Sequence, residues 1–177
     1  MDALKKDFFA FFSLDPAFGL DVDQLSASFR RIQSSMHPDR FVNASDPERR
    51  MAMQLATKAN EAHQTLANPL KRARYLCELN GQDVGAEDNT AMPPEFLMEQ
   101  MTWHEALDEW RSDPEPDVLQ SLVSRNQQAQ QALQDKLAQQ IDTDRDFESA
   151  AQTVRQFMFL DKFAQQLKSA GRRAVGP

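Results

Sequence analysis

The sequence has almost no cysteine, and its histidines are scattered. Its 177 residues include one cysteine, Cys77, so no intrachain disulfide can form. The three histidines, at positions 37, 63 and 104, do not have the spacing of a zinc site, which usually combines clustered Cys and His. We therefore expect no resident metal and no cofactor. Cys77 fits the role of a small buried hydrophobic residue.

Long hydrophobic runs are also missing. The longest near the N-terminus, "FFAFFSL" at residues 8–14, is far too short to span a bilayer. Two lysines precede it as in a signal peptide, but Asp7 stands at its edge and Asp15-Pro16 follows where a small-residue cleavage site would be. The first arginine is Arg30, which does not fit a transit peptide. We expect a cytoplasmic protein without membrane contact.

A general excess of positive charge is absent. The net charge is −7, and the acidic excess lies in residues 81–117, which contain 11 Asp and Glu but one Arg. Binding of nucleic acid through a broad basic surface would need the opposite balance. We therefore expect no nucleic-acid partner.

Glycine is scarce, with five residues, and no strand-like alternation of apolar and polar residues is present. The composition favours helices, and the fold class we predict is all-α. In the first half we expect a helix over residues 4–14 and a second one capped by Asp21 or Asp23. A third helix is expected from Pro47, capped by Asp46, to Ala67, with a short one ending at Leu79. The second helix carries a regular apolar stripe of Val22, Leu25, Phe29, Ile32 and Met36.

The second half predicts three more helices, at about residues 94–111, 117–141 and 145–170. Proline-rich "DPEP" at 113–116 separates the first two, and Asp142-Thr143-Asp144 separates the last two. Residues 81–93 hold two glycines and no sustained period, and we interpret them as a linker. The predicted architecture is an N-terminal helical hairpin joined to a C-terminal three-helix bundle.

The tripeptide His37-Pro38-Asp39 lies between the second and third predicted helices. Pro38 fixes its own φ and biases His37 out of the helical region, so a stiff loop presents the two polar side chains at the tip of a hairpin. Asp39 can accept a bidentate bond from a partner's arginine. No nucleophile or metal-ligand set stands beside the pair, so recognition fits better than acid–base catalysis, and we expect no enzyme. Taken alone, the tripeptide could also be an ordinary turn.

Phe29-Arg30-Arg31, followed after five residues by His37-Pro38-Asp39-Arg40 and a second long helix, resembles a J domain. The match covers roughly residues 6–76. J domains dock onto chaperones of the 70-kDa heat-shock class and stimulate their ATPase through this loop and a basic helix face. The resemblance implies a chaperone-binding role for six residues: Arg30, Arg31, His37, Pro38, Asp39 and Arg40. Met36 replaces the Tyr that is common before the His, at a position on the apolar stripe.

The helix predicted over residues 94–111 has two apolar faces. On a helical wheel, Phe96, Trp103, Leu107 and Trp110 fall within about 60° of each other and predict the core face. Leu97, Met98 and Met101 fall on the opposite side among acidic residues. Such a leftover apolar stripe indicates an interaction site, and Met suits adaptable contacts. The alternatives are that the bundle covers both faces or that the stripe packs on the J domain.

The second half resembles the HscB family of J-type co-chaperones of iron–sulfur cluster assembly. The resemblance lies in "FLMEQ" at 96–100, "LDE" at 107–109 and "VRQFMFLDKF" at 154–163, with "NPLKRARYL" at 68–76 joining the halves. It implies a bundle that binds the cluster scaffold protein (IscU type) and a J domain that stimulates a specialised chaperone (HscA type). The implied scaffold-binding residues are Leu97, Met98, Met101, Glu105, Glu109 and Phe159.

Some features qualify this resemblance. Phe159 falls off the predicted core stripe of Phe147, Ala151, Val154 and Met158, so we expect it to be exposed beside the first bundle helix. Thr102 replaces a Glu that is common in the family, which puts that polar contact in question. The cysteine-rich zinc segment of some eukaryotic relatives is absent, which favours a bacterial type. With a single cysteine, the chain is not expected to hold an iron–sulfur cluster by itself.

The resulting hypothesis is an adaptor with three parts: a J domain at residues 1–76, a short helix end and linker at 77–93, and a scaffold-binding bundle at 94–172. The alternative is a general J-domain holdase that delivers unfolded chains to the same class of chaperone. A holdase would bind apolar segments broadly, whereas the adaptor would bind one folded scaffold through one acid-rimmed face.

Overall fold

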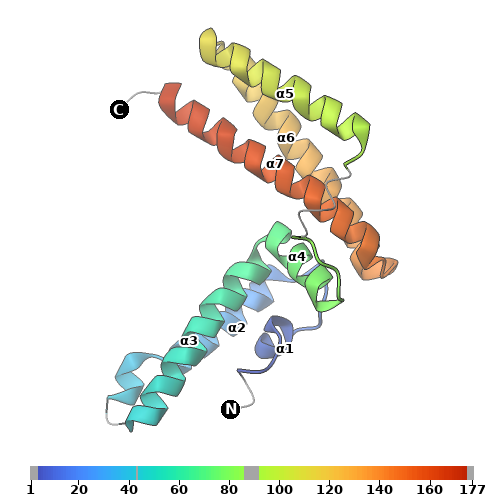
Figure 1. Ribbon diagram of the computed structural model, residues 1–177. Helices are drawn as coiled ribbons and strands as arrows, with labels where there is room; N and C mark the ends of the chain where they lie inside the picture. Colours follow the sequence, from blue (N-terminus) through green and yellow to red (C-terminus); the bar gives the residue numbers. More distant parts are fainter. Residues whose placement is uncertain (1–3, 43, 86–91, 175–177) are drawn as a thin grey trace. The chain divides into compact units, whose positions relative to one another are not determined.

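The computed structural model describes residues 4–42, 44–85 and 92–174, and every regular element in these ranges is a helix (Figure 1). The chain divides between Leu79 and Asn80 into two compact units, which we call the N-terminal unit and the C-terminal unit. The all-α prediction is confirmed for these ranges. Part of the predicted linker, residues 86–91, lies outside the described residues.

The N-terminal unit is built on a hairpin of two helices. It contains α1 (Phe8–Phe12), α2 (Val22–Ser35), the 3₁₀ turn η1 (Pro38–Phe41), α3 (Asp46–Ala67) and α4 (Pro69–Leu79). Helices α2 and α3 pack side by side, and η1 occupies the turn between them (Figure 1). The core is formed by small and apolar side chains that are fully or almost fully buried: Phe9, Leu25, Ala59, Ala62, Leu66, Ala73 and Leu76.

Helix α1 is shorter than the predicted residues 4–14. The Asp7 carboxylate accepts a hydrogen bond from the N–H of Ala10 at 2.8 Å, which fixes the helix start at Phe8. Ser13 ends the helix in the left-handed conformation, with φ of 57°. The chain before α1 is bound to α3 instead, because the Lys58 ammonium donates to the carbonyl of Leu4 at 2.7 Å.

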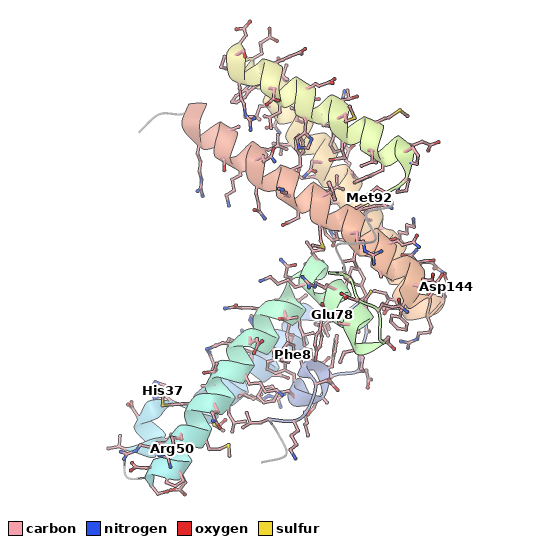
Figure 2. All side chains as sticks on the ribbon, in the orientation of Figure 1. Phe8, His37, Arg50, Glu78, Met92 and Asp144 are labelled. Carbon is pink, nitrogen blue, oxygen red and sulfur yellow. The ribbon has the colours of Figure 1, made fainter. Side chains whose placement is uncertain are left out.

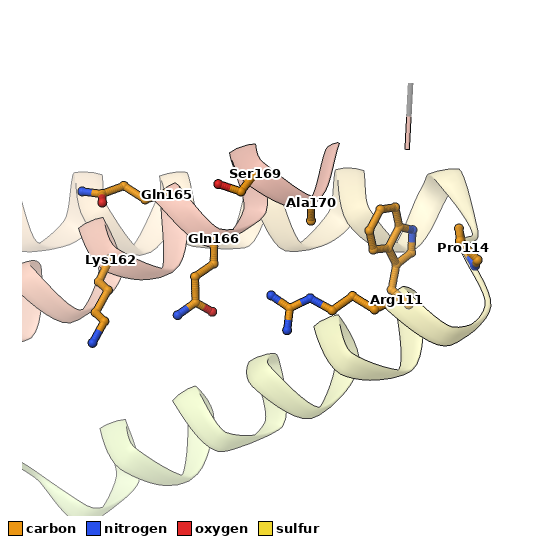
Figure 3. Close-up of a pocket in the computed structure, with 8 residues that line it drawn as sticks. Arg111, Pro114, Lys162, Gln165, Gln166, Ser169 and Ala170 are labelled. Atoms are coloured by element: carbon orange, nitrogen blue, oxygen red, sulfur yellow. The ribbon is translucent and has the colours of Figure 1, made fainter. Parts of the chain in front are cut away.

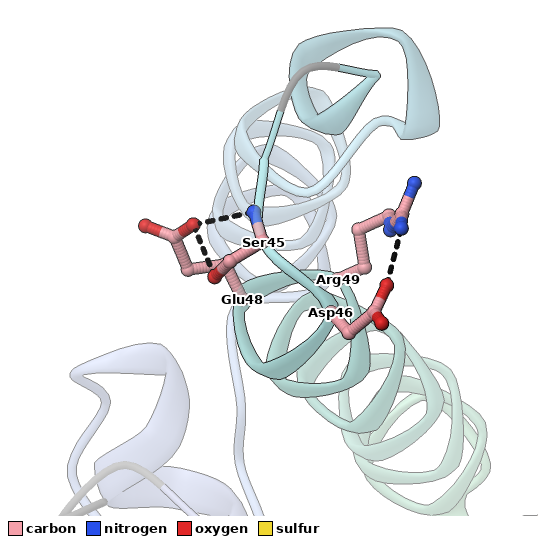
Figure 4. A network of polar contacts seen from close by, with 4 residues as sticks. All are labelled: Ser45, Asp46, Glu48 and Arg49. Atoms are coloured by element: carbon pink, nitrogen blue, oxygen red, sulfur yellow. Dashed lines mark hydrogen bonds and ion pairs between the residues drawn. The ribbon is translucent and has the colours of Figure 1, made fainter.

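The prediction for the start of α2 is confirmed, and that for α3 is wrong by one residue. Asp21 caps α2 by accepting from the backbone N–H groups of the first turn. At α3 the N-cap is Ser45 and not Asp46. The Glu48 carboxylate accepts from the Ser45 N–H at 2.8 Å and from its hydroxyl at 2.7 Å (Figure 4). Asp46 lies in the first turn and pairs with Arg49.

The C-terminal unit is a bundle of three long helices: α5 (Pro94–Ser112), α6 (Pro116–Ala138) and α7 (Phe147–Ala174). A π-helical turn, η2 (Gln139–Thr143), extends α6, and Arg145 then adopts a left-handed φ of 56° before α7. The core side chains come from all three helices: Trp103, Leu107, Trp110, Leu122, Leu160, Phe163 and Leu167. The three predicted bundle helices are present, and the chain reversal falls close to the predicted 142–144.

Candidate partner-binding surfaces

The His-Pro-Asp segment lies at the tip of the α2–α3 hairpin. Figure 2 shows His37 and Arg50 at one end of this hairpin, with Glu78 of α4 at the other. His37 has an extended backbone, with φ of −60° and ψ of 134°, and η1 begins directly after it at Pro38. The predicted effect of the proline on His37 is therefore confirmed, and α2 ends at Ser35.

The two polar side chains of this segment are held near each other and face solvent. The backbone N–H of Asp39 donates to Nδ1 of His37 at 3.3 Å, and the same Nδ1 lies 3.5 Å from Oδ2 of Asp39. The side chains are 61% and 86% exposed for His37 and Asp39. When Nδ1 accepts this bond, the neutral ring carries its proton on Nε2, so Nε2 is available as a donor. The tip thus offers a donor and a carboxylate to a partner.

The three candidate arginines surround one shallow depression beside this tip. Arg30 and Arg31 of α2 and Arg40 of η1 line a cleft of about 490 Å³, together with Ser34 and Ser35. The Arg31 guanidinium donates to the hydroxyl of Ser28 at 2.8 Å, which limits its freedom. Arg30 also lines a second depression, of about 520 Å³, which includes His37. The structure therefore brings together Arg30, Arg31, His37, Asp39 and Arg40, and we call this set the hairpin-tip surface.

Two further polar residues support this surface and were not predicted. Nε2 of Gln33 in α2 donates to Oδ1 of Asn60 in α3 at 3.5 Å, and both residues line the depression that contains His37. This bond joins the two hairpin helices beside the tip. The residues are far apart in the sequence and neither falls in a motif, so the sequence carries no signal for the pair.

The second apolar stripe of α5 is exposed, as predicted. Met98 and Met101 are each 62% exposed and Leu97 is 39% exposed, whereas Trp103 and Leu107 on the other side are buried. The alternative in which the bundle covers both faces of α5 is therefore wrong. Thr102 turns its hydroxyl back to the helix and donates to the carbonyl of Met98 at 3.1 Å. The two-faced pattern of α5 thus leaves apolar surface in contact with solvent.

Helix α7 adds an aromatic side chain next to this stripe. Phe159 is 47% exposed, and its ring meets Phe96 of α5 edge to face, with centroids 6.3 Å apart. Phe96 therefore links Phe159 to the segment that carries Leu97 and Met98. We call Leu97, Met98, Met101 and Phe159 the apolar patch. Glu105 and Glu109, the remaining predicted residues, are exposed further along α5.

The prediction for Met158 is wrong. It was expected on the core stripe of α7, but it is 37% exposed, and Phe157 is buried instead. Ala150, Thr153 and Val154 are buried as well. The buried face of α7 is therefore wider than the single stripe that a spacing of three and four residues defines. It is wider because α7 packs against two helices and not one.

An open cleft of about 640 Å³ lies between α5 and α7, and both polar and apolar residues line it (Figure 3). Arg111, Lys162 and Gln166 are among its lining residues, with Trp110 and Pro114 near the end of α5. It contains none of the predicted site residues. Among the residues that the structure describes, no cluster of His, Cys, Asp and Glu could hold a metal ion. Within the same ranges, no helix combines the length and apolar character needed to cross a membrane.

The fold and its two exposed surfaces define a class of protein: an all-helical binding protein that combines a J-type hairpin with a helical bundle. A family model described as the HSCB C-terminal oligomerisation domain matches residues 92–168. A co-chaperone protein HscB homologue of Paraburkholderia phymatum is 44% identical over 167 residues, which are 94% of this chain and 95% of that protein. The family model matches the C-terminal unit, and the match to this relative spans both units.

Solved structures give the same result. The chaperone HscB from Vibrio cholerae has a TM-score of 0.82 at 32% identity, covering 95% of this chain and 99% of that one. The human co-chaperone protein HscB has a TM-score of 0.85 at 25% identity, covering 92% and 81%. The chain belongs to the HscB co-chaperone family, as its motifs predicted. It is a co-chaperone and not an enzyme. The roles of the individual surface residues stay predictions.

Proposed function

We propose that this chain is a cytoplasmic adaptor in iron–sulfur cluster assembly. Its C-terminal unit binds a cluster scaffold protein of the IscU type, and its N-terminal unit stimulates the ATPase of a 70-kDa heat-shock-class chaperone of the HscA type. The observation that carries this proposal is the presence of two exposed surfaces of opposite chemistry on two separate compact units. The family membership supports it.

The hairpin-tip surface suits an acidic partner that associates rapidly and in one orientation. Three arginines line one depression, Arg30 and His37 line a second one, and Asp39 lies beside His37. Exposed cations raise the rate of encounter with an acidic surface. The fixed turn then offers a donor at His37 and an acceptor at Asp39, which only a partner with matching groups can satisfy. We therefore assign the binding and stimulation of the chaperone to this surface.

The apolar patch fits a folded partner with an apolar centre. Methionine and leucine side chains can adapt their shape to a partner, and Phe159 supplies a stiff aromatic anchor held by Phe96. Glu105 and Glu109 give this surface an acidic edge, so the complementary scaffold surface would have basic residues around an apolar centre. We therefore assign scaffold binding to the patch and these two glutamates.

Coupling between the two activities requires no further contact within the chain. A scaffold bound to the C-terminal unit is held at a high effective concentration near the chaperone that the N-terminal unit engages. Stimulated ATP hydrolysis then closes the chaperone on a client that is already present. Neither step needs a metal or cofactor held by the chain.

The test is a variant with Leu97, Met98 and Phe159 all changed to Ala. Truncation of a central interface residue costs about 2 kcal/mol, so we expect scaffold affinity to fall by at least about a hundredfold. Met53→Ala is the matched control, since Met53 is 71% exposed but lies in the N-terminal unit, outside both surfaces. Isothermal titration calorimetry with folded scaffold measures the affinity, and circular dichroism verifies the fold.

The same variant separates the adaptor from a general holdase. If binding to unfolded clients falls as much as binding to scaffold, the patch is a general apolar surface and the holdase is the better description. If scaffold affinity is unchanged, the proposed role of the patch is wrong. Loss of scaffold binding with little effect on unfolded clients supports the adaptor.

A further inference from the structure

The apolar patch contains two methionines that are largely exposed to solvent. Met98 and Met101 are each 62% exposed and lie three residues apart on α5, so they occupy adjacent turns of one helix face. The single cysteine of the chain, Cys77, is fully buried, which shields its sulfur from oxidants. Among the described residues, chemistry at exposed sulfur is therefore confined to methionine.

We propose that Met98 and Met101 form a reversible oxidation site, and that their conversion to sulfoxides closes the apolar patch to the scaffold. This proposal rests on the proposed function, since it concerns the same surface. The oxidant is hydrogen peroxide. The thioether sulfur attacks one peroxide oxygen, the O–O bond breaks, and the other oxygen leaves as water after taking up the two hydrogens. Sulfur gives up two electrons, the peroxide is reduced, and one sulfoxide forms for each peroxide consumed.

Among the methionines that the structure describes, Met53, Met98 and Met101 are the strongly exposed ones. Met36, Met51 and Met92 are only partly exposed, and Met158 is less exposed than Met98 or Met101. Oxidation requires contact of the sulfur with the oxidant, so the most exposed thioethers react first. Met53 is the one other strongly exposed methionine among the described residues, and it belongs to the N-terminal unit, whereas the patch belongs to the C-terminal unit.

A sulfoxide at either position changes what the patch can bind. The thioether is flexible, polarisable and apolar, and it can be buried against an apolar partner without an unmet hydrogen bond. The sulfoxide oxygen is a strong acceptor that loses water on burial, and the patch offers it no donor: the nearby Thr102 hydroxyl already donates to the Met98 carbonyl. Since the two methionines are neighbours on the helix, both penalties fall on the same part of the interface.

The experiment compares peroxide-treated and untreated protein, with catalase added to stop the reaction. Peptide mass spectrometry locates the sulfoxides, and calorimetry with folded scaffold measures the affinity. We expect Met53, Met98 and Met101 to oxidise first and scaffold affinity to fall at least tenfold. Treatment with methionine sulfoxide reductases and dithiothreitol should restore the affinity for scaffold. Both reductases are needed, because each acts on one epimer of the sulfoxide. Stimulation of the chaperone without scaffold should not change.

Two variants locate the effect. The double variant Met98→Leu, Met101→Leu has no sulfur in the patch that peroxide can oxidise, so treatment should change its own affinity for scaffold by less than about twofold, whatever that affinity is before treatment. The single variant Met53→Leu should lose affinity on treatment as the wild type does. Circular dichroism of each oxidised sample verifies that the bundle remains folded.

Three results would overturn the proposal. Peroxide-treated wild type that carries both sulfoxides yet binds scaffold normally would refute it, and so would equal loss of affinity in the double leucine variant. A failure of Met98 and Met101 to oxidise before the partly exposed methionines would also refute it. These results leave the proposed function intact, whereas untreated protein that does not bind scaffold would refute the proposed function itself.

Discussion

The two units of this chain place their candidate surfaces on different kinds of structure and use different chemistry. The hairpin-tip surface is polar and cationic, and its central residues lie on a short turn between two helices. The apolar patch lies on the outer sides of two long helices, opposite the side chains that form the bundle core. The charged groups of the hairpin-tip surface suit electrostatic steering of a partner and hydrogen bonds of fixed geometry. The apolar patch suits the burial of apolar area against a partner.

This difference explains why the two surfaces need different supports. A polar tip has to hold a few groups in place, and it does so with local bonds such as that between the Asp39 N–H and His37. An apolar patch needs a helix whose position is fixed. Helix α5 is fixed by burial of three side chains on its inner side: Trp103, Leu107 and Trp110. Damage to the core should therefore impair the patch, whereas changes at the tip should act on one partner only.

The largest expected effect comes from a core change in the C-terminal unit. Phe163 is fully buried and packs against Trp103 and His104. Phe163→Ala should lower the free energy of unfolding of this unit by about 3–5 kcal/mol, because it leaves a cavity. Both tryptophans of the chain lie in this unit, so tryptophan fluorescence during urea unfolding reports it selectively.

Met101→Ala is the control for this prediction, since it changes the outer side of the same bundle. Its free energy of unfolding should change by less than about 0.5 kcal/mol. In the Phe163→Ala variant, stimulation of the chaperone without scaffold should persist under conditions where the bundle has unfolded. Loss of that stimulation together with the bundle would mean that the units do not act separately.

An intermediate effect is expected from the arginines of the hairpin-tip surface. Arg30→Ala and Arg31→Ala should each weaken chaperone binding about fivefold, the effect of roughly 1 kcal/mol for an exposed ion pair. Raising the salt concentration should weaken chaperone binding of the wild type strongly and scaffold binding only slightly. Surface plasmon resonance at several salt concentrations measures both.

Arg125→Ala serves as the matched control, because Arg125 is an exposed arginine of α6 in the other unit. It should leave chaperone binding unchanged at every salt concentration. If Arg125→Ala has the same effect as Arg30→Ala, the interaction depends on overall charge and not on the hairpin-tip surface.

The smallest effect concerns the helix start behind the tip. Hydrogen bonds from the Ser45 hydroxyl and N–H hold the pKa of Glu48 below its usual value of 4.5. A carboxyl with a lowered pKa in the folded state stabilises the fold above its unfolded pKa, and this contribution is lost as the pH falls through the folded pKa. Ser45→Ala removes the larger of the two causes, so the pKa of Glu48 should rise towards 4.5 in an NMR titration.

The C-terminal unit contains a matching case. Ser149 lowers the pKa of Asp146 in the same way, again through its side chain and its N–H. Ser149→Ala should therefore raise the pKa of Asp146 and leave Glu48 alone, and Ser45→Ala should do the reverse. A pKa of Glu48 that does not move in Ser45→Ala would show that the hydroxyl bond is not formed in solution.

Much of the fold could be predicted because each helix has its own signals in the sequence. Proline, aspartate and serine mark the helix starts, and apolar spacing gave the buried side of α5 and its exposed stripe. The predicted helix boundaries are wrong where two adjacent residues could both cap a helix, or where a contact between distant residues decides. Ser45 and Asp46 are both good caps, and only the position of Glu48 relative to Ser45 decides between them. Helix α1 is short because Asp7 caps it and Lys58 binds the preceding chain, a contact between distant residues that no local pattern contains.

The candidate surfaces were predictable to a similar degree. The His-Pro-Asp segment and the arginines are close in the sequence, so a hairpin was enough to place them together. The bond between Gln33 and Asn60 and the ring contact between Phe96 and Phe159 depend on packing between helices, which spacing along one helix does not give. Met158 shows the same limit, since its exposure depends on how α7 is rotated against both neighbours.

The most direct test of the two-surface account is ATP turnover by the HscA-type chaperone with and without scaffold. The wild type should stimulate turnover, and scaffold should increase it beyond the sum of the separate effects. His37→Gln should abolish stimulation while scaffold binding remains, and the triple variant of the apolar patch should stimulate without the added effect of scaffold. If His37→Gln stimulates turnover as the wild type does, the hairpin tip is only a turn and the central claim is wrong.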